Sequence, residues 1–393
     1  MKKIPLGVWQ LASLMLLHFT ADMIGGILPG ILPVLRINFN MTLSAGVVFL
    51  AAKTLSSNFC QMAVGPLRKN SSRPFFIYIG LILLMLIGIF GFLPKDTPVW
   101  MLLVLAAVFG CGTAVVHPEG LRGAMAVKDV NGATATALFM TMGFFGFSCG
   151  PLIGAVLVDM KWGLKSLLFI AAFLVLVMVI LFAAKLTLLT DKKDKAAEKS
   201  EKIDYRWSFP VLFLIAFFMN SGSTLVQSLL PTFMHDINGF NLKIGGLAAL
   251  LFGLGSALGS VAGGIISRKI RPSTLTMFNL ASGVLLLLLY FALSRYIWAL
   301  AILFFAGFTA SSSLPLLVVM ARFASAKIVI GLKMGIMVGG SWGAAGIVLL
   351  GFSLLVEKVG LKNSMWIACS FYLIAFLIAA AAAFLPKKRI EDQ

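Results

Sequence analysis

Stretches of about 20 apolar residues, each ended by a short polar break, recur along the whole chain. A helix of about 20 residues crosses the hydrocarbon core of a bilayer, so each stretch predicts one transmembrane helix. The spans are expected at 8–35, 44–65, 74–93, 98–126, 131–158, 163–189, 207–233, 242–267, 272–293, 296–323, 328–355 and 361–385. The pattern therefore predicts an all-α integral membrane protein with twelve transmembrane helices.

The composition places the chain among membrane proteins and excludes the soluble classes. Of its 393 residues, 60% are hydrophobic and 12% are charged, whereas soluble domains carry about 25% charged residues. The formal net charge of +18 would by itself suit nucleic-acid binding. The lysines and arginines, however, lie in short clusters between the apolar spans, which is the pattern that orients membrane proteins. We therefore expect a lipid bilayer around the chain and no nucleic-acid partner.

The distribution of lysine and arginine also predicts which side of the membrane each loop occupies. Of the 32 basic residues, 22 lie at the two termini, in or beside the polar run 190–206, and in the loops that follow the second, fourth, eighth and tenth spans. Eight lie in the opposite loops. Cytoplasmic segments carry the excess of basic residues. Both termini are therefore predicted to be cytoplasmic, in a multi-pass protein of the cell inner (plasma) membrane.

The two halves of the chain repeat each other at an offset of 198 residues. The segments GPLRKNSSRP at 65–74 and GGIISRKIRP at 263–272 carry Gly, Arg and Pro at matching places, and the same offset aligns Asp22 with Asn220. Each half holds an even number of spans, so the two copies share one orientation as parallel six-helix repeats. The predicted domains are an N-terminal bundle at 1–189, a cytoplasmic linker at 190–206 and a C-terminal bundle at 207–393.

An aspartate lies near the middle of the first span. Asp22 follows His18 by one helical turn and precedes Pro29 and Pro33, which can bend the helix. An ionised carboxylate at the bilayer centre costs several kcal/mol unless it faces a cavity, so this helix is expected to line a pathway. Burial favours the protonated carboxyl and a nearby cation favours the ionised one, so Asp22 can load and release a proton. His18 is the candidate relay; the structural alternative is an aspartate that pairs with a lysine to fix helix packing.

Two lysines lie well inside spans of opposite halves, Lys53 in the second span and Lys333 in the eleventh. Because an ammonium deep in the membrane is costly, we predict that both face one cavity and together hold an anionic substrate. The alternatives are that Lys53 pairs with Asp22 and that Lys333 extends to the membrane surface. Polar side chains on the second and seventh spans can join this substrate site or simply hold helices together: Ser57, Asn220 and Gln227.

The fourth span carries three polar residues toward its cytoplasmic end. Glu119 and Arg122 are three residues apart and can pair on one helix face. We expect them to form a gate network with Arg73 or Arg268 that breaks and reforms during transport; an interfacial ion pair that anchors the helix end is the alternative. His117 lies deeper in the span and can reach the substrate cavity.

Twelve spans in a six-plus-six repeat, with short basic loops after the second and eighth spans, resemble the major facilitator superfamily over the whole chain. The loop signature of that superfamily departs from its usual form here. Gly65 and Arg73 are kept, but Lys69 stands where the superfamily has an aspartate. The charge pairing by which that loop usually locks the cytoplasmic gate is therefore not expected in its ordinary form.

Two further motifs are more specific. In the fifth span, GFFGFSCGPLIGA at 143–155 looks like the signature of superfamily exporters that exchange substrate for protons, although close helix packing through glycine is an equal explanation. The segment GCGTAVVHPEGLRGAM at 110–125, together with HFTADMIGGILPGILPVL in the first span, is similar to the fosmidomycin-resistance family. Its members are efflux transporters, and the drug that names them is a small phosphonate anion.

Together these features predict a proton-coupled secondary transporter that moves a small organic anion or drug-like solute by alternating access, as efflux by proton antiport. The alternative is uptake or exchange of an anionic metabolite such as an organophosphate or carboxylate. A remoter alternative is a membrane enzyme with His117 and Glu119 as acid and base. The sequence disfavours it, because it has no metal-ligand cluster, activated nucleophile or cofactor loop. We expect a monomer with no cofactor and no metal, driven by the proton gradient.

Overall fold

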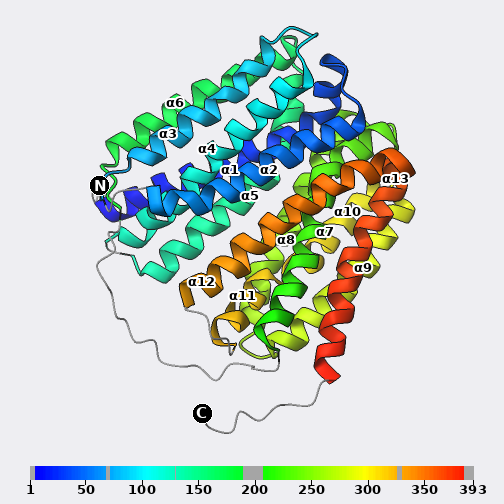
Figure 1. The fold of residues 1–393 in the computed structure, drawn as a ribbon. Helices are drawn as coiled ribbons and strands as arrows, with labels where there is room; N and C mark the ends of the chain where they lie inside the picture. The colour runs from blue at the N-terminus through cyan, green and yellow to red at the C-terminus, as the bar shows by residue number, and fades with distance from the viewer. Residues whose placement is uncertain (1–4, 68–70, 129, 189–206, 325–329, 385–393) are drawn as a thin grey trace.

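The computed structural model describes residues 5–67, 71–128, 130–188, 207–324 and 330–384 (Figure 1). Within these ranges all regular structure is helical. The predicted linker at 190–206 and Lys69 lie outside the described residues.

The first half of the chain forms six spans close to the predicted positions. Two of them contain a short 3₁₀ segment, at the end of the third span and at the start of the sixth. The helices are α1 Leu6–Asn38, α2 Leu43–Leu67, α3 Phe75–Leu84 with η1 Met85–Gly91, α4 Val99–Ala126, α5 Gly132–Val158, and η2 Gly163–Leu167 with α6 Leu168–Ala183.

The second half repeats this arrangement with two interruptions. The tenth span is broken at residues 311–313, and the eleventh begins with a short helix and a π-helical turn. The helices are α7 Phe209–Asp236, α8 Leu242–Ile266, α9 Pro272–Leu293, η3 Ile297–Ala299 with α10 Leu300–Ala310, α11 Leu314–Phe323, α12 Ile330–Gly335, η4 Ile336–Gly340 and α13 Ser341–Phe384.

The long helix α13 contains the remainder of the eleventh span and the twelfth span. Gly360 divides them with φ of 80°, a conformation that glycine adopts at little cost. Ten described segments are long and apolar enough to cross a membrane, the longest of them being this divided one, and the shorter apolar segment Phe75–Gly91 supplies the third span. The prediction of twelve transmembrane helices is therefore confirmed.

The two halves lie side by side as separate bundles (Figure 1). They meet where α1 packs on α7, α5 on α8, and α2 on α13. We call the side on which α6 ends the linker side; the start of α1 is there too, because the Gln10 amide donates to the carbonyls of Ala184 and Lys185. The opposite side is the far side.

Two ion pairs join the halves on the far side. Arg36 at the end of α1 lies 2.6 Å from Asp236 at the end of α7. Asp159, just after α5, lies 2.6 Å from Lys243 in the first turn of α8. Among the described residues, no ion pair joins the halves on the linker side. These two ion pairs therefore close the contact between the bundles on the far side.

The glycine-rich motif of α5 packs against α1. A side chain at Gly146 would collide with the backbone of Phe19, and one at Gly150 would collide with the backbone of Met23 and Gly26. The absence of side chains at these positions therefore lets two backbones approach closely. This contact fixes the position of α1 against α5, and α1 in turn carries the aspartate in the first span.

Candidate functional site

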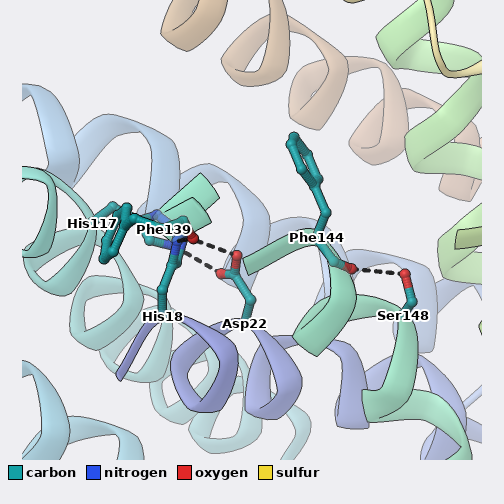
Figure 2. Close-up of polar contacts among 6 residues, drawn as sticks. All are labelled: His18, Asp22, His117, Phe139, Phe144 and Ser148. Atoms are coloured by element: carbon teal, nitrogen blue, oxygen red, sulfur yellow. Dashed lines mark hydrogen bonds and ion pairs between the residues drawn. The ribbon is translucent and has the colours of Figure 1, made fainter. Parts of the chain in front are cut away.

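Asp22 is held between two histidines from different helices (Figure 2). Its Oδ1 lies 2.7 Å from Nε2 of His117 on α4, and its Oδ2 lies 3.2 Å from Nε2 of His18, one turn earlier on α1. The structure thus brings together three of the predicted site residues, two of them 95 positions apart in the chain. We refer to His18, Asp22 and His117 as the carboxylate–histidine cluster.

The protonation of His18 follows from its second ring nitrogen. Nδ1 lies 2.7 Å from the backbone carbonyl oxygen of Phe139 on α5. A carbonyl oxygen can only accept, so Nδ1 carries a hydrogen and donates it. The other nitrogen, Nε2, faces Asp22. A bare Nε2 lone pair against a bare carboxylate oxygen would be repulsive, so a proton lies between them, either on the imidazole or on the carboxyl group.

One wall of the cluster is closed and the other is accessible. His18 is only 4% exposed, and its ring stacks on Phe139 with centroids 4.1 Å apart. On α5, a side chain at Gly143 would collide with the His18 ring and would place its Cβ 2.6 Å from Asp22 Oδ2. The side chains of Asp22 and His117, in contrast, are 17% and 23% exposed. The accessible edge of the cluster is therefore formed by Asp22 and His117, and His18 forms its buried edge.

Lys53 of α2 lies beside the cluster. Its Nζ is so close to Gly25, one turn after Asp22 on α1, that a Cβ added there would be 2.9 Å away. The ring of Phe147 on α5 lies 5.9 Å from Nζ. In the described part of the chain, no ion pair or hydrogen bond engages this ammonium. Lys53 therefore places a basic group where α1, α2 and α5 meet.

The carboxylate–histidine cluster is also the group of described residues that could hold a metal ion, because its three donor atoms lie within 4.8 Å of one another. The observed separations of 2.7 and 3.2 Å are hydrogen-bond lengths. Ligands of a tetrahedral zinc ion about 2.1 Å from the metal are about 3.4 Å apart. The neighbouring Lys53 ammonium would also repel a cation. The arrangement fits shared protons better than a metal.

Comparison with known proteins agrees with this architecture. The family model described as Major Facilitator Superfamily matches residues 14–327 and 212–393. The chain belongs to this superfamily. It is therefore a multi-pass membrane transporter for a small-molecule substrate.

Two relatives of the superfamily carry drug-resistance names. The Fosmidomycin resistance protein of Escherichia coli (strain K12) is 24% identical over 97% of this chain and 94% of its own length. The Multidrug resistance protein MdtG of Proteus mirabilis (strain HI4320) is 25% identical over 55% of this chain and 56% of its own length. The resemblance to the fosmidomycin-resistance family is thus confirmed.

Solved superfamily structures share the fold. An inward-facing, occupied bacterial homologue of the human lysosomal transporter Spinster aligns with TM-score 0.72 at 15% identity, over 97% of both chains. A point mutant of the nucleoside transporter NupG aligns with TM-score 0.72 at 10% identity, over 95% of this chain and 99% of its own.

The gate residues predicted on α4 form a local pair. Nη1 of Arg122 donates to both carboxylate oxygens of Glu119, at 2.9 and 3.1 Å, and Nη2 donates to the carbonyl of Ser71 in the loop after α2. Glu119 is 1% exposed and Arg122 6%. Arg73 and Arg268 are exposed. The network that would join them to Glu119 and Arg122 in this superfamily member stays a prediction.

The remaining substrate-site candidates lie in contacts within their own halves. Lys333 is buried, and its Nζ donates at 2.8 Å to the carbonyl of Ala324, the residue directly after α11. A cation is favourable at that end of a helix. The other contacts are Asn220 to Ser341 at 2.8 Å, Gln227 to Ser223 at 2.7 Å, and Ser57 buried where α2 meets Gly110 of α4. The two-lysine clamp of Lys53 and Lys333 therefore stays a prediction.

Two parts of the site could not be predicted from the sequence. The carbonyl of Phe139 and the space left by Gly143 both come from α5, a helix without charged residues. A backbone acceptor has no signature in sequence. Gly143 is the first residue of the glycine-rich stretch 143–155, which predicted an exporter signature or close helix packing, and its place in that stretch was the available signal.

Proposed function

We propose that this superfamily member is a proton-coupled secondary transporter that moves a small organic anion by alternating access. The observation that carries the proposal is the contact of the Asp22 carboxylate with the ring nitrogens of His18 and His117. Three groups that can bind protons converge there, and two of them are accessible. A small change in their spacing alters which group holds the proton, because the hydrogen bonds weaken steeply with distance and angle.

The position of α1 supports coupling between this proton and movement of the halves. In its own half α1 packs on α4 and α5, which complete the cluster. Across the interface it packs on α7 and α8. A rearrangement between the halves therefore acts directly on the helix that carries Asp22. Substrate movement and proton release are in this way mechanically linked.

The substrate charge is proposed from Lys53. An ammonium inside the membrane is stabilised by an anion, and no described residue supplies one within ion-pair distance of its Nζ. The neighbouring Phe147 offers an apolar surface for the organic part of the ligand. A small anion with an apolar portion fits these two features.

The far-side ion pairs support a two-state cycle. Arg36–Asp236 and Lys243–Asp159 close that side in the conformation described here, and they must separate for it to open. We propose that the linker side is cytoplasmic, in accord with its excess of basic residues. On this assignment the described conformation is closed to the outside.

The direction of the coupled step has two candidates. The names of the two drug-resistance relatives favour export. Export driven by an inward proton gradient is proton antiport, because protons enter as the substrate leaves. The second candidate is uptake together with protons, and the observation in its favour is the positive charge of Lys53 beside a site that binds protons.

Transport of fosmidomycin into proteoliposomes tests the proposed function. The purified protein is reconstituted with a pH-sensitive dye inside, and an outward or inward gradient of the drug is applied. We expect the drug gradient to move protons, and a pH gradient to move the drug. Drug flux with no proton movement under either gradient would reject proton coupling, whereas absence of any anion flux would reject the anionic substrate.

A further inference from the structure

The carboxylate–histidine cluster and Lys53 lie next to each other on α1. Asp22 and Gly25 are one helical turn apart, and Lys53 reaches the position of Gly25. From this placement we infer that an anion at Lys53 and a proton in the cluster bind together, each increasing the affinity for the other. The inference rests on the proposed function and adds the sign of the coupling.

The argument follows from the charges at the site. With one proton between His18 and Asp22 and with His117 neutral, the cluster carries no net charge, and Lys53 leaves the site at +1. A monovalent anion then brings the site to neutrality. Without that proton the site is already neutral, and the same anion would leave it at −1 in surroundings of low dielectric constant, where net charge is costly.

The other charged groups on the packed helices do not change this balance. On α4, Glu119 and Arg122 neutralise each other. At the far ends of α1 and α7, Arg36 is paired with Asp236, which also contacts His235. At the start of α8, Lys243 is paired with Asp159. The described parts of α3, α5 and α6 carry no Asp, Glu, Lys, Arg or His. On α13, which packs on α2, Glu357, Lys358 and Lys362 are exposed. Among the charged groups named here, the cluster and Lys53 are the ones that lie next to each other at this site.

The sign of this coupling separates the two directions of transport. Antiport requires one ligand to leave as the other binds, which suits a cationic substrate that competes with protons for Asp22. An anion at Lys53 is instead favoured by the bound proton, and both then cross in the same conformational step. The inference therefore selects movement of anion and proton together, which is the second candidate above. By linkage, the bound anion raises the affinity for the proton by the same factor by which the bound proton raises the affinity for the anion.

Titration calorimetry with methanesulfonate tests the inference. This anion keeps a single charge across the neutral and mildly acidic range, so any pH dependence belongs to the protein. The full-length protein in lipid nanodiscs is titrated at several pH values and in buffers of different ionisation heat. We expect affinity to rise on acidification by up to about tenfold for each pH unit, with uptake of up to about one proton per bound anion.

Three variants complete the experiment. Asp22→Asn should remove the pH dependence and the proton uptake, whereas Lys53→Gln should lower the affinity about thirtyfold or more at every pH. Lys358→Gln, an exposed lysine of α13, is the matched control and should bind as the wild type does. Binding that is independent of pH, or that weakens in acid, overturns the inference and leaves the proposed function to the flux assay. No binding to the wild type overturns the anion site itself.

Discussion

Gly143 is the residue of α5 on which the space for the carboxylate–histidine cluster depends. Replacing it with alanine would place Cβ 2.6 Å from Asp22 Oδ2 and against the His18 ring. A comfortable carbon–oxygen contact is about 3.3 Å, so the atoms must separate by about 0.7 Å. Helix α5 cannot easily supply this movement, because Gly146 and Gly150 already bring its backbone against α1. We therefore expect the Asp22 carboxylate or the His18 ring to move.

The magnitude follows from these contacts. A shift of that size takes the 3.2 Å contact between His18 and Asp22 beyond hydrogen-bond distance. Overpacking by one methyl group costs about 1–3 kcal/mol, and a coupling free energy of that size corresponds to about a 5- to 150-fold effect. Gly143→Ala should therefore lower proton-coupled flux by at least about fivefold while anion exchange without net proton movement continues.

The assay compares both fluxes in proteoliposomes for the wild type, Gly143→Ala and a matched control. Gly132→Ala is that control, because it adds the same methyl group to the same helix at a position with nothing within 4 Å. The control should retain both fluxes. If Gly143→Ala retains wild-type proton coupling and wild-type thermal stability, the packing argument for the cluster is wrong.

Three further predictions concern the rest of the molecule. Lys333→Gln should lower the free energy of unfolding by about 1.5–3 kcal/mol, because it removes a charged hydrogen bond. If Lys333 has only this structural role, methanesulfonate binding measured by calorimetry is unchanged; lost binding with unchanged unfolding would support the two-lysine clamp. Arg36→Cys with Asp236→Cys should form a disulfide across the far-side contact that stops transport until a reductant is added, and full transport by the oxidised protein would reject closure there. A cysteine at Arg271 should react with a membrane-impermeant reagent only from the cytoplasm and one at Lys95 only from outside; the reverse would overturn the orientation.

The fold could be predicted from sequence because the bilayer imposes a strong length requirement on each apolar stretch. The offset of 198 residues also indicated the repeat, and the aligned pair Asp22 and Asn220 shows how the halves differ. Asp22 meets two histidines, whereas Asn220 donates to Ser341 on the eleventh span. The neutral copy lies in a contact between helices, and the charged copy forms the candidate proton site.

The side-chain geometry of the site could be predicted only in part. Asp22 and His18 were recognisable together because they are one turn apart on one helix. The approach of His117 depends on how α4 packs on α1, which no local pattern specifies. Lys333 was predicted to reach a cavity or the membrane surface. The structure shows its Nζ donating to the backbone carbonyl of Ala324, an acceptor that sequence spacing does not indicate.

The measurement that tests the central claim most directly is proton movement by Asp22→Asn in dye-loaded proteoliposomes. Asparagine keeps the shape of the side chain and removes its titratable group. Our account predicts that a fosmidomycin gradient moves protons through the wild-type protein but not through this variant, while labelled fosmidomycin still exchanges across the membrane in both. Undiminished proton movement through Asp22→Asn would contradict the assignment of the carboxylate–histidine cluster as the proton site.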